Sequence, residues 1–320
     1  MAEQMTAQRA GDNALAHEQA QAQTQAQTGE QRLAPPQVGV AMQLSPRIWR
    51  VTAPNAGVMT GPGTNTYLVG DVADNVWTVI DPGPNDPRHI QAVADAAPGR
   101  ITSIVVTHTH TDHSPGAAPL KAMTGAPVYG MHPAYPLKQD ATFAPDRVLV
   151  HGERLPIGAQ TTLRVVHTPG HASNHLCYLL EEEQTLFTGD HIMQGSTVII
   201  NPPDGDMSAY LESLDALQGE SLAWLAPGHG TMMNDPADAI RRLVRHRLLR
   251  ESKVVNAMRR VGAADIPTLV KSVYDDVPES RHGIAQRSLD AHLQKLARDG
   301  SATVDGEVWQ LTPKGAAIDS

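Results

Sequence analysis

Cysteine is almost absent from this 320-residue chain, in which Cys177 is the single example. One cysteine cannot form an intrachain disulfide, which is typical of a protein in a reducing compartment, so we expect a cytoplasmic location. Long hydrophobic runs are also missing. No stretch of about 18 apolar residues occurs, so neither a membrane span nor a membrane partner is expected. The first 30 residues contain no apolar segment of the kind found in secretory signals.

Aromatic residues and positive charge are both scarce. Phe, Trp and Tyr make up 4% of the chain, whereas hydrophobic residues as a whole make up 41%, so aliphatic side chains must fill the core. The formal net charge is −9 at pH 7, which gives no overall sign of nucleic-acid binding. Histidine is the exception to this plain composition, because the placement of its 15 residues carries the functional argument.

Turn signals and apolar runs divide the chain into three parts. Residues 1–38 are predicted to form a disordered tail, because their Gln-rich, low-complexity stretch cannot bury apolar surface. Residues 39–235 alternate short apolar runs with helical segments, which indicates an α/β domain of packed sheets covered by helices. Residues 236–320 predict three helices and a hairpin that turns at Asp305-Gly306, the pattern of a small winged-helix domain.

The central motif is Thr107-His-Thr-His-Thr-Asp-His113, which follows an apolar run, residues 101–107, predicted to be a strand buried on both faces. His108 and His110 are two residues apart and therefore project to one side of extended chain. Asp112 and His113 follow where the chain starts to turn. Such a segment can offer two imidazoles to one metal ion and a carboxylate with an imidazole to another. An exposed polar loop is the alternative, which the number and spacing of these residues disfavour.

Three further candidate ligands follow apolar runs. They are His171 in Thr-Pro-Gly-His, Asp190 in Thr-Gly-Asp, and His229 in Pro-Gly-His. A glycine directly precedes each of them and permits close approach of the backbone. Any one of the three alone would more often be a surface residue. Because open α/β sheets collect their sites at the carboxyl ends of strands, we expect the four segments to bring seven side chains into one pocket.

In this order the motifs resemble those of the metallo-β-lactamase superfamily, over roughly residues 42–235. The resemblance implies an αββα sandwich. It also implies two metal sites with one shared ligand, and these comprise His108, His110 and His171 for the first, Asp112, His113 and His229 for the second, and Asp190 as the bridge. Asp81, which follows its own strand, matches an acidic position of the family that supports the metal-binding loop, so it is not expected to be a ligand.

A narrower resemblance includes the C-terminal part of the chain. It rests on four segments: Gly61-Pro-Gly-Thr-Asn-Thr-Tyr-Leu-Val69, Thr168-Pro-Gly-His-Ala-Ser-Asn-His175, Pro202-Pro-Asp-Gly-Asp-Met207, and His246-Arg247 ahead of Arg250-Glu251. These look like the beta-lactamase-like protein branch, which carries a C-terminal winged helix and includes an endoribonuclease. Many true β-lactamases of this fold place a cysteine in the second metal site, where this chain has Asp190. Antibiotic hydrolysis is therefore disfavoured, whereas hydroxyacylglutathione hydrolases, lactonases and ribonucleases have similar ligand sets.

The resemblance implies an enzyme in which a hydroxide bridging two divalent metal ions attacks an ester, thioester or lactone of small size. Zinc is the favoured ion, with iron or manganese as alternatives. Asp112 is the candidate catalytic residue, because its carboxylate would also orient the nucleophile. An endoribonuclease acting on single-stranded RNA is the alternative, and a nucleic-acid-binding regulator with a vestigial metal site is a third hypothesis, disfavoured by the intact ligand set. A basic groove would favour RNA, and a small apolar pocket would favour an ester.

Other polar residues near the motifs have two interpretations each. His175 and His191 could contact substrate or donate a proton, or they could be ordinary core histidines. Structural roles are favoured for Asn65 and Tyr67, which lie on a predicted strand, and turn roles are favoured for the Asp204 and Asp206 side chains.

The predicted winged helix carries no basic stripe. Its third helix contains Arg287, Lys295 and Arg298 together with Asp290 and Asp299, so the charges nearly balance. Packing, dimerisation or covering of the active site is therefore favoured over docking of nucleic acid, and a homodimer is one arrangement that this role allows.

Overall fold

The computed structural model describes residues 29–317, so most of the predicted tail, residues 1–38, lies outside the described part. Residues 29–33 form a helical turn. The Arg32 side chain is buried there, donates to the Leu44 carbonyl oxygen at 3.2 Å and forms an ion pair with Glu183. The end of the segment predicted as a tail therefore packs against the first domain.

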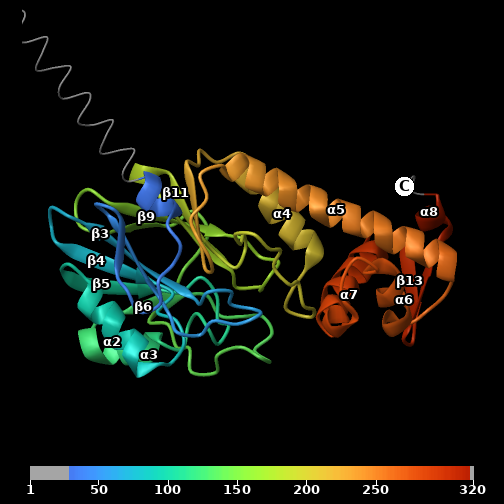
Figure 1. Cartoon of the computed structure of the whole chain (residues 1–320), viewed down its shortest axis with the longest axis horizontal. Coiled ribbons are helices and arrows are strands. Elements are labelled where there is room, and N and C mark those ends of the chain that lie inside the picture. The colour runs from blue at the N-terminus through green and yellow to red at the C-terminus, as the bar shows by residue number, and fades with distance from the viewer. Residues whose placement is uncertain (1–28, 318–320) are drawn as a thin grey trace, which may run out of the picture.

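Two β-sheets form the inner layers of the first domain (Figure 1). The first sheet contains, in spatial order, β1 (Met42–Ser45), β2 (Ile48–Thr52), β3 (Asn65–Asp71), β4 (Val76–Ile80), β5 (Arg100–Val105), β6 (Val128–Gly130) and β7 (Arg147–Val148). The second contains, in spatial order, β12 (Trp224–Pro227), β11 (Thr185–Gly189), β10 (Leu176–Leu180), β9 (Thr162–His167) and β8 (Arg154–Pro156). Apolar side chains from both sheets share one core, in which the rings of Tyr67 and Phe187 meet edge to face at 5.0 Å.

Helices cover the outer face of each sheet. Helices α2 (Pro87–Ala96) and α3 (Ala117–Thr124) pack on the first sheet, where Ile90 and Leu120 are buried. Helix α4 (Met207–Leu217) and the first half of α5 (Pro236–Val261) pack on the second. The four layers form the αββα sandwich expected from the sequence, and the predicted fold class is confirmed.

The C-terminal unit has its own core, to which α5, α6 (Ile266–Val273) and α7 (His282–Arg298) contribute, together with the hairpin of β13 (Ala302–Asp305) and β14 (Val308–Leu311). Two short 3₁₀ helices, η1 (Glu181–Glu183) and η2 (Glu279–Arg281), and a final helix α8 (Pro313–Ala316) complete the described elements. Three helices and a hairpin confirm the predicted winged helix. The turn differs by one residue: Asp305 pairs with Val308, so Gly306 and Glu307 form it.

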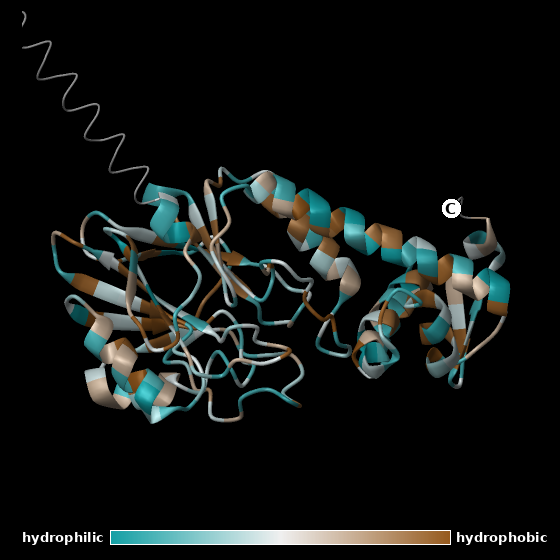
Figure 2. Cartoon of the chain, in the orientation of Figure 1, coloured by the Kyte–Doolittle hydropathy of each residue, from teal (hydrophilic) through white to brown (hydrophobic). Residues whose placement is uncertain are grey.

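The start of α5 agrees with the sequence signals. The Asp235 side chain accepts a hydrogen bond from the Asp238 backbone N–H, and Pro236 is the first helical residue. Figure 2 shows hydrophobic and hydrophilic residues alternating along α5, as expected of a helix with one buried side. None of the helices within residues 29–317 combines the length and the apolar composition needed to span a membrane.

The direction of the strands determines where the loops meet. Strand β10 is antiparallel to both β9 and β11, and β11 is parallel to β12, so β9, β11 and β12 end at the same edge of their sheet. In the other sheet, β5 ends beside β4, and the Asp81 backbone N–H donates to the Val105 carbonyl oxygen at 3.0 Å. The loops that follow β5, β9, β11 and β12 carry all seven predicted ligands.

Candidate metal centre

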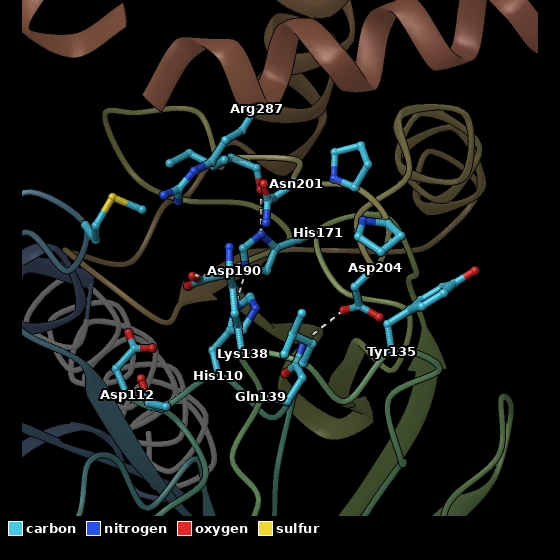
Figure 3. Close-up of a pocket in the computed structure, with 16 residues that line it drawn as sticks. His110, Asp112, Tyr135, Lys138, Gln139, His171, Asp190, Asn201, Asp204 and Arg287 are labelled. Atoms are coloured by element: carbon cyan, nitrogen blue, oxygen red, sulfur yellow. Dashed lines mark hydrogen bonds and ion pairs between the residues drawn. The ribbon is translucent and has the colours of Figure 1, made fainter. Parts of the chain in front are cut away.

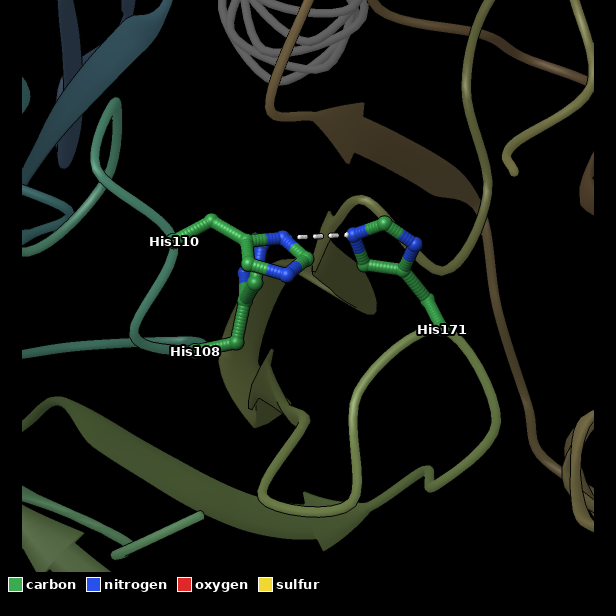
Figure 4. A group of neighbouring side chains, drawn as sticks. All are labelled: His108, His110 and His171. Atoms are coloured by element: carbon green, nitrogen blue, oxygen red, sulfur yellow. Dashed lines mark hydrogen bonds between the residues drawn. The ribbon is translucent and has the colours of Figure 1, made fainter. Parts of the chain in front are cut away.

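Three imidazoles form the first group of ligand-type atoms. His108 and His110 lie in the loop after β5, and His171 lies in the loop after β9 (Figure 4). The Nδ1 atom of His110 is 2.9 Å from His108 Nε2 and 2.9 Å from His171 Nε2. These three ring nitrogens therefore point at one another, as the side chains of a shared metal site do.

Asp112, His113 and His229 form a second group beside the first. Oδ2 of Asp112 is 3.4 Å from Nε2 of His113 and 3.3 Å from Nε2 of His229. Both imidazoles are buried, whereas the carboxylate of Asp112 is partly exposed and lines a cavity. The loops after β5 and β12 thus meet here, although 116 residues of chain separate His113 from His229.

Asp190 lies between the two groups, directly after β11. Its Oδ1 atom is 3.4 Å from Nε2 of His113 and 3.2 Å from Nε2 of His229, while its Oδ2 atom is 3.6 Å from Nε2 of His171. One carboxylate therefore faces both groups, which is the geometry of the bridging position that the resemblance assigned to it. The structure brings all seven predicted residues into one pocket.

Glycines make this convergence possible. A Cβ on Gly228 would lie 2.8 Å from Cε1 of His113 and 3.0 Å from Oδ1 of Asp190. A Cβ on Gly189 would lie 2.6 Å from Oγ1 of Thr107, and its φ of +45° is disfavoured for other residues. The expected close backbone approach beside the ligands is therefore present at both positions.

Hydrogen bonds at the outer ring nitrogens of His171 and His229 determine which nitrogen of each ring presents its lone pair to the pocket. Nδ1 of His171 lies 2.8 Å from the Ile199 carbonyl oxygen, and Nδ1 of His229 lies 3.2 Å from the Gly63 carbonyl oxygen. Because a carbonyl only accepts, both Nδ1 atoms must carry the proton. In the neutral rings, Nε2 then presents its lone pair to the pocket, which is the arrangement that partners behind metal ligands normally impose.

Asp81 supports the loop after β5, as expected. Its carboxylate accepts hydrogen bonds from the Thr107 backbone N–H and hydroxyl, both at 2.7 Å. It also accepts from Nδ1 of His113 at 2.8 Å, and it is buried. The hydroxyl of Thr107 in turn lies 3.1 Å from Nδ1 of His108. Asp81 therefore orients residues of both groups without facing the pocket itself.

The pKa values of the histidines are shifted in opposite directions in the two groups. Burial and the neighbouring imidazoles lower the pKa of His110 to about 3 and hold the pKa of His108 well below its ordinary value. Burial also opposes charge on His229, yet Asp190 and Asp112 outweigh it and raise the pKa of His229 to about 9. The pKa of Asp112 falls to about 2 because His113 and His229 outweigh its burial. The first group thus holds neutral imidazoles, while the second attracts positive charge.

This donor set fits a pair of cations. Within the described part of the chain, Nε2 of His113, Nε2 of His229 and Oδ1 of Asp190 are buried and make no hydrogen bond of acceptable geometry. Burying such atoms is costly unless a partner neutralises them. Two ligands at about 2.0–2.1 Å from a tetrahedral ion lie about 3.4 Å apart. The spacings of 3.2–3.4 Å in the second group match that value.

A cavity of about 290 Å³ opens onto this edge (Figure 3). It is lined by His110, Asp112, His171 and Asp190, and by residues that were not predicted to border the site: Met59, Tyr135, Leu137, Lys138, Gln139, Ile199, Asn201 and Arg287. Arg287 belongs to α7 of the winged helix, so this domain contributes to the wall. The fold brings these residues together from segments that are distant in the sequence.

Other residues singled out in the sequence have structural roles. Both ring nitrogens of His175 are engaged, with Thr168 Oγ1 at 2.9 Å and the Asp190 backbone N–H at 3.2 Å. His191 is fully buried against the ring of Tyr210, and neither histidine lines the cavity. They are core histidines. Cys177 is also buried, which raises the pKa of its thiol to about 12, so it is neither a nucleophile nor a ligand.

The remaining four polar residues hold loops in place. The side-chain amide of Asn65 donates to the carbonyl oxygens of Pro227 and Gly230, and the Tyr67 hydroxyl also donates to that of Pro227. Asp206 caps α4, as its side chain accepts from the backbone N–H of the second and third helical residues. Asp204 accepts from Gln139 and lines the cavity, which a turn role alone did not predict.

Comparison with protein families gives two matches. The metallo-beta-lactamase superfamily matches residues 59–229, and the beta-lactamase associated winged helix domain matches residues 266–309. The first match includes every predicted ligand, and the second covers α6, α7 and the hairpin up to Trp309.

Two curated proteins with similar sequences come from species of Aspergillus. A lactamase-like protein of Aspergillus niger is 30% identical over 294 residues, which cover 86% of this chain and 88% of that protein. A protein of Aspergillus chevalieri called atrochrysone carboxyl ACP thioesterase is 30% identical over 265 residues, with coverages of 79% and 80%.

Solved structures agree with the fold. A beta-lactamase domain protein from Burkholderia ambifaria superposes with a TM-score of 0.74 at 19% identity, covering 87% of this chain and 95% of that one. A metallo-beta-lactamase family protein from Thermus thermophilus gives a TM-score of 0.70 at 19% identity, with coverages of 84% and 100%. These alignments extend over both the sandwich and the winged helix.

Proposed function

Because the chain belongs to the metallo-beta-lactamase superfamily, we propose that it is a hydrolase that holds two zinc ions and cleaves a thioester or a related ester. One observation carries this proposal. The two oxygens of Asp190 face two separate groups of ligand-type atoms, one of three imidazoles and one of two imidazoles with Asp112. Imidazole and carboxylate ligands suit zinc, and they also suit iron and manganese.

The residues of this chain would divide the work as follows. The two groups and Asp190 would hold divalent cations, which when bound would supply a water molecule with a pKa lowered toward 7 and would polarise the scissile carbonyl. Asp112 borders the cavity, and the Thr64 hydroxyl donates to its Oδ2 atom at 3.5 Å, which helps to fix the carboxylate. That carboxylate could accept a hydrogen bond from the attacking water and orient it, the role predicted for Asp112.

The lining of the cavity supports an ester-type substrate. Apolar side chains such as Met59, Leu137 and Ile199 border the ligand atoms, as in sites for small organic molecules. The curated relatives that are named as thioesterases add weight to the thioester among the possible ester-type substrates. This chain has Asp190 where many β-lactamases of the fold have a cysteine, which argues against a β-lactam substrate.

Metal content and a substrate panel test the proposal. Purified protein, loaded with zinc and dialysed, should contain close to two equivalents of metal per chain by mass spectrometry. It should hydrolyse short-chain acyl thioesters faster than lactones, phosphodiesters or single-stranded RNA. Asp190→Asn should reduce this hydrolysis by at least about 100-fold, because a ligand change exceeds the usual effect of residues behind the ligands. Asp215→Asn, an exposed carboxylate on α4, is the matched control and should retain activity.

Different results would overturn different parts of the proposal. One equivalent of metal with full activity would contradict the dinuclear site. Iron or manganese that supports faster turnover than zinc would correct the metal. Cleavage of RNA, with no turnover of thioesters or esters, would replace the substrate class with the endoribonuclease alternative. An Asp190→Asn variant as active as Asp215→Asn would remove the bridging assignment.

A further inference from the structure

A second chamber adjoins the candidate metal centre, and the winged helix forms one of its walls. The chamber has a volume of about 280 Å³ and reaches His171 and Asp190, which also border the first cavity. Its other walls come from the loop around Val58 and from residues 193–199 after β11. The winged-helix residues that line it are Tyr274, Val277, Arg281, Ile284, Ala285 and Ser288.

The position of this wall is fixed by contacts between the two domains. Arg298, near the end of α7, forms an ion pair with Asp206, the residue that caps α4. Ala291 of α7 is buried in the same apolar cluster as Tyr210 of α4. The face of α7 that points at the metal edge is therefore held in register with the first domain, as a binding surface requires.

Two guanidinium groups that the winged helix presents to these cavities have no partner among the described residues: Arg281 lines the chamber, and Arg287 lines the first cavity. Within residues 29–317, the side chains of Arg281 and Arg287 make neither an ion pair nor a hydrogen bond that the structure records, and both are exposed. Two other arginines of the C-terminal unit are paired: Arg250 binds Asp276, and Arg298 binds Asp206. Figure 3 shows Arg287 extending from α7 toward the side of the cavity where Asp190 and His171 lie.

A third free cation faces the same cavity from the first domain. Lys138 lines the first cavity, and its φ of +68° is unusual for a residue other than glycine. Its ammonium group makes no recorded ion pair among the described residues. Around it, Tyr135 and Leu137 are 48% and 81% exposed, and Met59 is 50% exposed on the opposite loop. The rim of the site therefore combines free positive charge with exposed apolar surface.

This combination indicates an amphiphilic, negatively charged ligand. The whole chain carries a net charge of −9, so its long-range field repels anions, and an anionic substrate would need local cations to be held. Guanidinium groups bind phosphate and carboxylate in bidentate fashion, which makes free arginines beside a cavity suited to that task. The apolar lining favours a hydrocarbon chain, which gains free energy when it leaves water.

We propose that the winged helix is the substrate-recognition half of this enzyme. Arg287 beside the first cavity and Arg281 beside the chamber bind phosphate or carboxylate groups of the substrate. The chamber beside Ile284 takes the apolar acyl chain, while the ester bond lies at the metal edge. The inference rests on the proposed hydrolase function for the reaction, but the binding it describes can be measured without turnover.

Thioether ligands provide this measurement, because they resemble thioesters but lack the thioester carbonyl at which hydrolysis occurs. Three probes separate the sources of the anion: S-octyl coenzyme A carries phosphates, S-octyl-N-acetylcysteamine is neutral, and S-(7-carboxyheptyl)-N-acetylcysteamine carries a carboxylate at the end of the chain. Zinc-loaded protein titrated by calorimetry should bind at least one anionic probe about tenfold or more tightly than the neutral one, since a hydrogen bond to a charged group contributes about 1.5–3 kcal/mol. The anionic probe that binds more tightly than the neutral one shows whether the protein recognises a phosphate or a carboxylate.

Two substitutions assign the effect to the winged helix. Arg281→Gln and Arg287→Gln should each weaken the favoured anionic probe by about tenfold and leave the neutral probe unchanged. The control is Arg245→Gln, which removes an exposed arginine of α5 that lies outside both cavities and should change neither affinity. Equal affinities for all three probes, or an effect of Arg245→Gln as large as the others, would overturn the assignment of the anion site.

Chain length tests the chamber separately. S-octyl-N-acetylcysteamine should bind at least about tenfold more tightly than its S-ethyl analogue, because burial of only about two methylenes, at about 0.8 kcal/mol each, gives that factor. Ile284→Ala should reduce this gain several-fold. No gain with chain length would refute the acyl chamber. If the probes bind as expected but no thioester or ester is turned over, the recognition site stands and the hydrolase proposal fails. If a thioester or ester is turned over but the three probes bind equally well, the hydrolase proposal stands and the recognition site is refuted.

Discussion

Adding one methyl group at Gly228 should separate the metal centre from the stability of the fold. The backbone of Gly228 does not have a positive φ, so alanine is allowed there, but its Cβ would lie 2.8 Å from Cε1 of His113. Carbon atoms in contact prefer about 3.5–4.0 Å, so the His113 ring must move by roughly 0.7 Å or more. The same Cβ would lie 3.0 Å from Oδ1 of Asp190.

A displacement of this size exceeds what a metal site tolerates. Ligand distances in such sites hold to within about 0.2 Å, so Gly228→Ala should weaken the second ion by at least the 10–100-fold that is typical of disturbed supporting residues. The cost to the fold should be smaller, about 1–3 kcal/mol for an overpacked methyl group. We therefore expect a folded protein that retains about one equivalent of zinc after dialysis and loses most of its hydrolytic activity.

The assay is competition for zinc against a chelator of known affinity, with thermal unfolding of the metal-free protein measured in parallel. Gly219→Ala is the control, because the single neighbour of its Cβ, the carbonyl oxygen of Ala216 at 3.6 Å, is at ordinary contact distance. If Gly228→Ala binds two zinc ions as tightly as the Gly219→Ala control, the crowding argument is refuted. A variant that unfolds would show a cost far above that of one methyl group, and this too would contradict the reasoning.

Two further predictions concern stability. Asp206→Ala removes the cap of α4 together with the ion pair to Arg298, and should lower the free energy of unfolding in urea by about 1–2 kcal/mol. Arg298→Ala removes the exposed ion pair alone and should lower it by less than about 1 kcal/mol. Equal losses in the two variants would show that capping contributes nothing. His89 is buried, which lowers its pKa from 6.5 to about 4, so the unfolded chain binds its proton first as the pH falls. The stability that neutral His89 provides is therefore complete above about pH 6.5 and is lost toward pH 4, by at most about 3 kcal/mol, and His89→Gln should flatten this part of the pH profile of chemical unfolding.

The groups of candidate ligands could be predicted from the sequence because the information that indicates them is local. Each candidate ligand lies within eight residues of a strand end. The type and spacing of residues such as His108 and His110 indicate metal binding without knowledge of distant contacts. The glycine beside each later ligand is readable for the same reason. Strand direction then brings the loops together, since β9, β11 and β12 all end at one edge.

Strand boundaries were less predictable, because polar side chains can take the place of a neighbouring strand as hydrogen-bond partners of backbone N–H groups. The strand expected over residues 101–107 ends at Val105. The N–H of Thr107 donates to the Asp81 carboxylate and does not join a sheet ladder. Strands β1, β7 and β8 were not predicted at all. They are two to four residues long, and β7 is exposed, so they carry little apolar alternation.

The two free arginines of the winged helix, Arg281 and Arg287, could not be singled out from the sequence. Arg281 and Arg287 lie in a segment with nearly balanced charge, and nothing local separates them from Arg298, which the structure pairs with Asp206. Whether an arginine is paired or free depends on which carboxylate the tertiary fold brings near it. The prediction that the third helix has no basic stripe was therefore compatible with two free guanidinium groups beside the cavity.

Helix α5 belongs to two hydrophobic cores at once. Ala239 and Ile240, in its first turns, are buried with α4 against the second sheet, whereas Val254 and Met258, near its end, are buried in the winged-helix core. A truncated chain that stops at the predicted domain boundary near residue 235 would lose part of the outer layer of the sandwich. The two units therefore have one helix in common, and we expect them to unfold in a single thermal transition and to resist separation by limited proteolysis.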